Sequence, residues 1–199
     1  MSDRPDPALD LDVVTRLHDQ LDWHWQAQSR PRLDGLTDEE YLWEPAPGTW
    51  NVRRREDPAP GTVTRRAGAG GWLVDLGIPE PEPAPVTSIA WRLAHVVVGV
   101  LGARAASHFG GRPASYDGWT YAGTAQEALL QLDEAYAAWS AGVRSLTPAL
   151  LARPVGPAEG PWAEAPMIDL VLHINRETIH HLAEVALLRD LWAHRARGS

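Results

Sequence analysis

Residues 88–108 read SIAWRLAHVVVGVLGARAASH and contain the most apolar run of the chain. Between Leu93 and Ala103 the one ionisable side chain is that of His95. A helix that is apolar almost all round is buried by other elements on every side. Gly99 and Gly102 would let a neighbouring helix approach closely. The stretch therefore predicts a core helix that carries a single histidine.

Three further stretches place apolar residues at helical spacing, and each has a start signal. Asp6 is an expected cap, with Pro7 as the first helical residue. Thr124 and Glu127 form a capping box, and Pro166 suits a first helical turn. The stretches are residues 6–29, 124–146 and 166–193. No alternating pattern competes over a comparable length, so we expect an all-α four-helix bundle.

The first connection in this bundle, residues 44–86, holds eight prolines and six glycines in 43 positions. A connection of this length is commonly functional or disordered. Trp50 and Trp72 are costly to leave in water, so part of it should be ordered, with a short strand or turn at 72–76. The whole chain, 1–199, is expected to form one domain with this long Pro/Gly-rich first crossover. Its tail, residues 193–199, should fray.

Composition excludes several classes of function. The chain has 26 acidic residues against 18 basic ones, all of them arginine, for a net charge of −8. A protein this acidic is a poor general binder of nucleic acid or anionic membrane, and its arginines at 53–55 and 65–66 should form a solvated loop face. Without cysteine or lysine it has no disulfide, thiolate ligand or Schiff base. No apolar run reaches the ~18 residues of a membrane span and no signal peptide is evident, so we expect a cytoplasmic protein.

The candidate site lies on the last predicted helix. Glu177 and His181 are four residues apart, so they share one helix face, which should point inward. A buried carboxylate and imidazole need a partner, either a divalent cation or a hydrogen-bonded network. Taken alone, the pair also fits a surface or hydrogen-bonded pair. His95, on a second inward helix, favours a cation, because three N/O ligands with an open position suit a catalytic zinc or nickel centre.

Other catalytic patterns are missing from the sequence. It has no His-Glu-x-x-His motif, no second Glu-x-x-His motif of a di-iron bundle and no Gly-x-Ser-x-Gly elbow. Five other stretches together are familiar: LTDEEYLWEP at 36–45, GTWNVR at 48–53, IAWRLAH at 89–95, YAGT at 121–124 and HINRETIHH at 173–181.

With these stretches the chain resembles the DinB/YfiT-like superfamily, and specifically its actinobacterial branch of mycothiol-type transferases. The resemblance runs from about Leu17 to Leu191. It implies an up-up-down-down four-helix bundle that is often dimeric. It also implies a metal site with one histidine from the second long helix, matching His95, and a pair from the last helix, matching Glu177 and His181.

The sequence shows two special features at that implied site. Most relatives have histidine at the first position of the pair, whereas here it is Glu177, as in the mycothiol-dependent maleylpyruvate isomerases. His180 is adjacent to His181 and would replace it if the register were shifted by one residue.

The resemblance implies a divalent metal, zinc or nickel, and a low-molecular-weight thiol such as mycothiol as cosubstrate. The expected function is a thiol-dependent S-transferase or isomerase that acts on small electrophilic molecules, as a homodimer without nucleic acid or membrane partners. Because the chain has no cysteine, its nucleophile would come from outside. The alternatives are a non-catalytic bundle that binds a metal or small ligand, and a hydrolase that uses a metal hydroxide.

Overall fold

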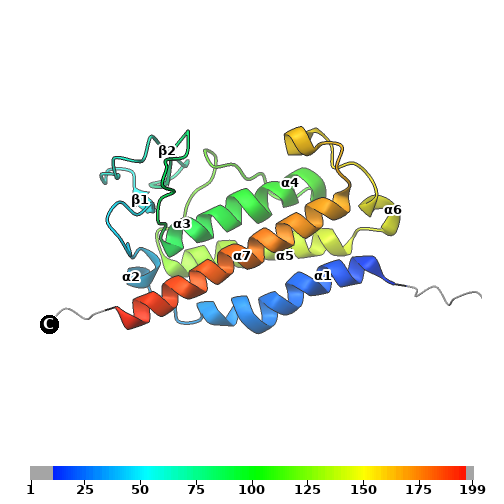
Figure 1. Cartoon of the computed structure of the whole chain (residues 1–199), viewed down its shortest axis with the longest axis horizontal. Helices are drawn as coiled ribbons and strands as arrows, with labels where there is room; N and C mark the ends of the chain where they lie inside the picture. Colours follow the sequence, from blue (N-terminus) through cyan, green and yellow to red (C-terminus); the bar gives the residue numbers. More distant parts are fainter. Residues whose placement is uncertain (1–10, 196–199) are drawn as a thin grey trace, which may run out of the picture.

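The computed structural model describes residues 11–195, and four long helical segments run through them (Figure 1). The first is α1 (Val13–His24) with the π-helical η1 (Trp25–Ser29); the second is α3 (Ile89–Ala94), the π-helix η3 (His95–Gly102) and α4 (Ala103–Phe109); the others are α5 (Ala125–Arg144) and α7 (Met167–His194). Shorter helices are η2 (Pro31–Leu33), α2 (Asp38–Tyr41), α6 (Pro148–Leu151) and η4 (Pro157–Trp162).

The ends of these helices refine the predicted bounds. Asp12 caps α1 by accepting from the Thr15 N–H at 3.1 Å, and the expected cap Asp6 lies outside the described residues. Thr124 caps α5 as predicted, because its hydroxyl accepts from the Glu127 N–H. The last helix continues to His194, so the start of the expected frayed tail is helical.

Contacts between the segments fix their relative directions. The first segment and α7 run one way, and the second segment and α5 run the other way (Figure 1). The order along the chain is therefore up, down, down, up, and the up-up-down-down order is wrong. The deciding pairs are His18–Ser140 and Arg30–Asp133 between the first segment and α5, Leu17–Asn175 and Arg32–Asp190 toward α7, and Arg92–Glu184 and His95–His181 between the second segment and α7.

The long crossover was predicted for the first connection of the bundle, but in the structure the second connection, residues 110–124, runs back along the helices. Residues 30–88 join neighbouring ends of two antiparallel segments, so they need not run the length of the helices. The second segment and α5 are parallel, and residues 110–124 therefore return along them. A methyl group on Gly99 would collide with the Tyr116 hydroxyl, and one on Gly102 would lie 3.0 Å from Ala114 Cβ. Gly99 thus makes room for the returning segment, whereas Gly102 makes room first for the Val97 carbonyl of its own helix and then for Ala114.

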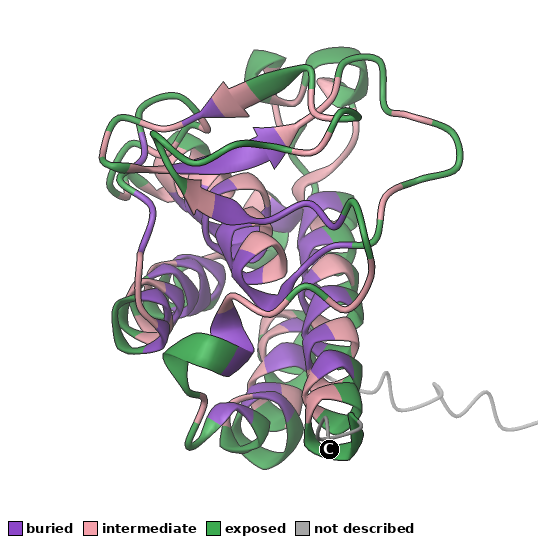
Figure 2. Ribbon diagram, turned by 90° about the vertical axis from the view of Figure 1, so that its left-hand side faces the viewer, coloured by how far each residue is buried: buried purple, intermediate pink, exposed green. Residues whose placement is uncertain are grey.

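The 44–86 region contains a three-stranded antiparallel sheet, so the all-α prediction is wrong here. Its central strand is β3 (Trp72–Leu76), as the sequence suggested, flanked by β1 (Val52–Arg54) and β2 (Arg65–Ala67). Val74 pairs with Val52 and with Ala67, and all three are buried, so the sheet has an apolar centre. Figure 2 shows this buried centre beside the helices.

The arginines of this region build its turns and are not merely solvated. Arg53 donates from Nε to Asp75 at 2.8 Å, inside the sheet. Arg55 and Arg66 donate to backbone carbonyls of nearby turns, and Arg65 is paired with an aspartate. Four of the five arginines therefore have partners within the protein.

The second segment lies in the core. Val96 and Leu101 are fully buried, and the apolar residues around His95 pack against α5 and α7. By length and composition alone, Ile89–Phe109 is long and apolar enough to cross a membrane, yet 61% of its most apolar window is buried inside the protein. Because core helices share this property, it is weak evidence for a membrane span.

Candidate metal centre

His95, Glu177 and His181 come together where η3 crosses α7. The rings of His95 and His181 meet edge to face, with centroids 4.7 Å apart and planes at 89°. Nε2 of His181 lies 3.6 Å from Oε2 of Glu177, one helical turn earlier. Two antiparallel helices thus bring His95 and Glu177 each next to His181, but the ligand atoms of the three residues do not all lie within 4.8 Å of one another.

The imidazole of His95 is held by its neighbours. Nδ1 lies 2.7 Å from the hydroxyl of Tyr116, and the ring of Trp91 stacks on it at 5.4 Å with planes 12° apart. Burial, reinforced by His181, Arg92 and Arg104, lowers the pKa of His95 to about 4. The ring is therefore neutral at pH 7, which is the form that binds metals. Because the Tyr116 hydroxyl occupies Nδ1 of His95, Nε2 is the nitrogen that remains free to bind a metal ion.

The π-helix η3 changes which residues share a face with His95. Arg104 follows nine residues later, and at about 100° per residue an α-helix would place it on the opposite side. A π-helix has roughly 4.4 residues per turn, or about 82° per residue. Seven such steps through η3 and two α-helical steps to Arg104 reduce the separation to roughly 50°. His95 and Arg104 accordingly line the same cavity.

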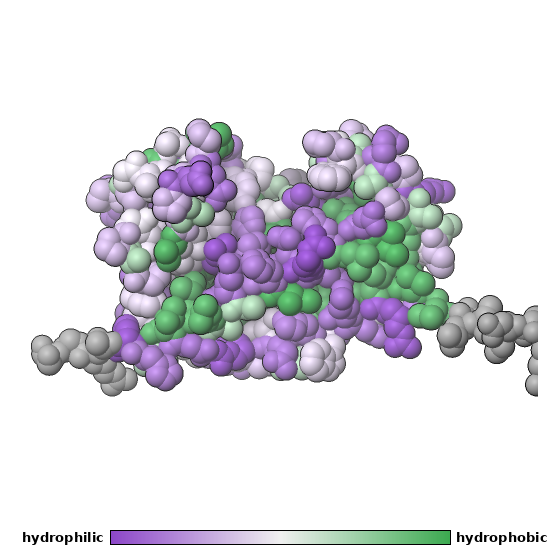
Figure 3. All heavy atoms as spheres, viewed as in Figure 1, coloured by the Kyte–Doolittle hydropathy of each residue, from purple (hydrophilic) through white to green (hydrophobic). Residues whose placement is uncertain are grey.

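That cavity, of about 350 Å³, is large enough for a small molecule. Val98 and Ala103 give it an apolar side. In the view of Figure 3, hydrophilic side chains gather in a hollow between two raised parts of the molecule. The polar lining residues are His95, Arg104, Ser115, Tyr116, His173 and Glu177.

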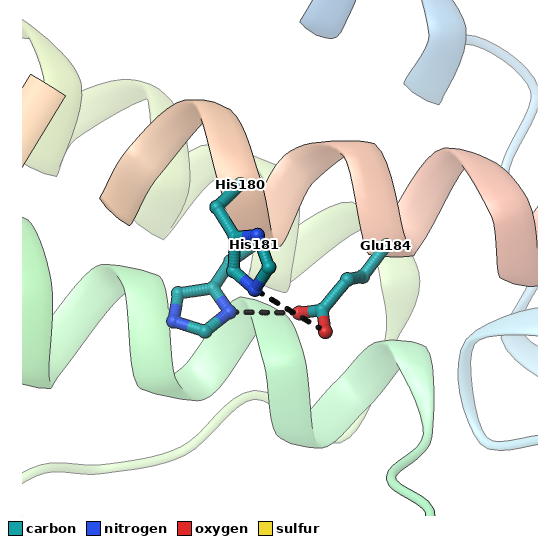
Figure 4. Close-up of side chains that lie close together, drawn as sticks. All are labelled: His180, His181 and Glu184. Carbon is teal, nitrogen blue, oxygen red and sulfur yellow. Dashed lines mark hydrogen bonds and ion pairs between the residues drawn. The ribbon is translucent and has the colours of Figure 1, made fainter. Parts of the chain in front are cut away.

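A group of three residues on α7 could hold a metal ion. His180, His181 and Glu184 each offer one ligand atom, and these atoms lie within 4.8 Å of one another (Figure 4). Within residues 11–195 no other group of three or more such residues meets this spacing, so the predicted set of His95, Glu177 and His181 is more widely spaced. The group on α7 uses the other nitrogen of His181, because Nδ1 lies 2.8 Å from Oε2 of Glu184. His181 therefore faces two different sets of ligands.

The Nδ1 side of His181 already faces a positive charge. The NH1 group of Arg92 lies 3.2 Å from Oε2 of Glu184 and 3.4 Å from Nδ1 of His181. A metal ion there would have to displace this guanidinium. The side chain of His180 is 62% exposed, whereas that of His181 is 10% exposed. The inward register thus belongs to His181, as the predicted face required.

Comparison with known families identifies the chain. The DinB superfamily profile matches residues 62–185, more than half of the sequence. The chain belongs to the DinB superfamily. The matched region runs from before β2 to the last turns of α7 and contains His95, Glu177 and His181. No curated protein and no solved structure matches the chain.

Three residues around this candidate site were missed from the sequence. Glu184 lies three residues after His181, and Arg92 three before His95, so helical spacing could have revealed both. Tyr116 comes from the segment that connects α4 to α5, and no sequence pattern placed it near His95. Only the fold brings it there.

Proposed function

We propose that this DinB superfamily protein binds one divalent cation, zinc or nickel, through Nε2 of His95, Nε2 of His181 and the Glu177 carboxylate. We further propose that it is a thiol-dependent S-transferase or isomerase acting on small electrophiles. The observation that carries the proposal is that a neutral His95 and Glu177 both lie next to His181, and that His95 and Glu177 line a small-molecule cavity.

The donor set fits such a cation. Two imidazole nitrogens and one carboxylate oxygen suit zinc or nickel, and three protein ligands leave a position open. The contact between Tyr116 and Nδ1 of His95 is the kind of outer partner that fixes the tautomer of a ligating histidine. Burial raises the pKa of Tyr116 to about 12, so its phenol keeps its proton at neutral pH.

A bound divalent cation would lower the pKa of a thiol in the cavity, so that thiolate is present at neutral pH. With no cysteine in the chain, that thiol is a small molecule, and the resemblance suggests mycothiol. Arg104 is held at the cavity wall by the Gly99 carbonyl and by Glu159. Its remaining donors would orient an anionic group of the thiol or the electrophile. Val98 and Ala103 would limit the water around the reacting atoms.

The larger setting is also proposed. We take the four helical segments as the four-helix bundle of this superfamily, in a cytoplasmic homodimer with neither nucleic acid nor membrane as partner. The net charge of −8 supports the absence of a polyanionic partner.

The test is an assay of metal-loaded protein against small electrophiles, with and without mycothiol or another low-molecular-weight thiol. We expect turnover only when both metal and thiol are present, and a rate that rises with pH as thiolate forms. Hydrolysis without thiol would instead assign a hydrolase to the same centre. Stoichiometric metal binding with no turnover of any tested electrophile would favour a non-catalytic binding protein.

A further inference from the structure

The indole of Trp91 connects the three-stranded sheet with the imidazole of His95. Its N–H donates to the backbone carbonyl of Asp75 in β3 at 2.7 Å. Its ring stacks on His95 with centroids 5.4 Å apart and planes at 12°. The two residues are four apart, so one face of the helix presents both. One side chain therefore contacts both the sheet and the histidine.

The sheet end of this connection is firmly held. β3 is the central strand, and the Asp75 carboxylate is fully buried and accepts from Arg53 Nε at 2.8 Å and from the Asn51 N–H at 3.0 Å. The buried ring of Trp50 lies 6.3 Å from that of Trp91. The carbonyl to which Trp91 donates thus belongs to a well-packed strand.

At the His95 end, the stacked Trp91 ring restricts a motion of the imidazole that the hydrogen bond to Tyr116 leaves free. Rotation of an imidazole about χ2 is soft, because the torsion joins sp³ and sp² atoms and has broad minima. A single hydrogen bond at Nδ1 fixes one atom but allows the ring to tilt about it. A flat ring on one face restricts that tilt and thereby sets the direction of Nε2.

We propose that Trp91 is a positioning residue, through which the sheet of the 44–86 region sets the plane of the His95 ring for cation binding. The inference rests on the proposed function in one respect, that His95 is a ligand. It assigns a role to the sheet, which lies outside the cavity and supplies no ligand to the proposed site.

Cobalt(II) titration of the full chain tests the proposal, because cobalt reports both affinity and ligand geometry by its visible absorption. Trp91→Leu should weaken cobalt binding about tenfold or more and alter the spectrum, as loss of outer partners typically does. Trp91→Phe keeps a flat ring without the N–H and should lie between wild type and Trp91→Leu. Trp119→Phe is the matched control, since that buried indole donates its N–H to Gln131 at 3.0 Å and does not stack on His95. It should bind like wild type.

A readout without metal separates the stack from the ligand role. In the metal-free protein, the ring current of Trp91 should shift the His95 ring protons upfield in NMR spectra, and Trp91→Leu should remove the shift. Wild type that binds no cobalt would refute the proposed function itself. Wild type that binds cobalt while Trp91→Leu matches it in affinity and spectrum would overturn the positioning role alone. Should Trp91→Leu fail to fold, Trp91→Phe decides by cobalt affinity and spectrum: since it loses only the N–H that joins the ring to β3, binding equal to wild type would overturn the role of the sheet.

Discussion

The ring of His95 meets the ring of His181 edge to face at 4.7 Å, and the two rings come from antiparallel helices. His181 divides its surroundings, because Nε2 faces Glu177 at 3.6 Å and Nδ1 faces Glu184 at 2.8 Å. A cation on the Nε2 side would border the cavity. A cation on the Nδ1 side would replace Arg92.

Two isosteric substitutions distinguish these sides. Glu177→Gln should reduce metal retention at least about tenfold, because it removes an anionic ligand, whereas Glu184→Gln should leave it nearly unchanged. The measurement is elemental analysis of protein purified without chelator or affinity tag, for which wild type should give close to one divalent metal per chain. Loss of metal in Glu184→Gln and His180→Ala, but not in Glu177→Gln, would move the site to the Nδ1 side.

Two histidine substitutions serve as the positive and negative controls for the same measurement of metal content. His181→Ala should abolish metal retention on either side, because both ligand sets include this residue. His194→Ala, at the exposed end of α7, should change nothing and serves as the control. Equal metal content in His181→Ala and wild type would contradict both placements.

Tyr116→Phe should weaken metal binding by about 10–100-fold, since it deletes the partner of His95 Nδ1 and keeps the ring. Gly99→Ala should act in the same direction, because its methyl group would displace the Tyr116 hydroxyl. Tyr41→Phe is a matched control, as that buried hydroxyl donates to the Ala122 carbonyl at 3.1 Å. Zinc affinities measured by competition with a chromogenic chelator would show the difference; equal affinities for Tyr116→Phe and Tyr41→Phe would refute it.

The low pKa of His95 predicts acid sensitivity of the metal-free fold. Its value is about 4 in the folded chain against 6.5 ordinarily, so below pH 6.5 the unfolded chain binds a proton that the folded chain does not. The free energy of unfolding should therefore fall as the pH drops from 6.5 to about 4, by at most about 3 kcal/mol. Urea unfolding at several pH values, with chelator present, measures this. His95→Gln should lose that part of the pH dependence; an unchanged slope would show that other groups cause it.

Helical periodicity predicted the long helices well, because each buries a continuous apolar stripe and carries local start signals such as Thr124. It could not predict their directions, which depend on which ends the connections join. The strands β1 and β2 escaped detection because each has three residues and includes exposed arginine, too short for an alternating pattern.

Some residues of the candidate site could likewise be predicted from local sequence, and others could not. The spacing of Glu177 and His181, and the isolation of His95 in an apolar helix, were visible in the sequence. The position of Tyr116 next to His95 could not be seen in the sequence, because it depends on the path of residues 110–124 over η3. The π-helical register that turns Arg104 toward the cavity also follows from tertiary packing and not from local spacing.

Removal of Arg53 should destabilise the sheet strongly. Asp75 is fully buried, its Oδ1 has no hydrogen-bond partner, and its Oδ2 accepts from Arg53 and the Asn51 N–H. Burial raises the pKa of Asp75, and Asn51 and Arg53 oppose that rise by stabilising the carboxylate. Arg53→Gln would leave a buried carboxylate without its cation, which typically costs about 3–5 kcal/mol of unfolding free energy in urea titrations. Arg54→Gln, at an exposed position, should cost less than about 1 kcal/mol. Asp75→Asn replaces the buried carboxylate with a neutral amide, which needs no cation beside it. Arg53→Gln combined with Asp75→Asn should therefore recover part of the lost unfolding free energy. A double variant no more stable than Arg53→Gln alone would contradict the charge explanation.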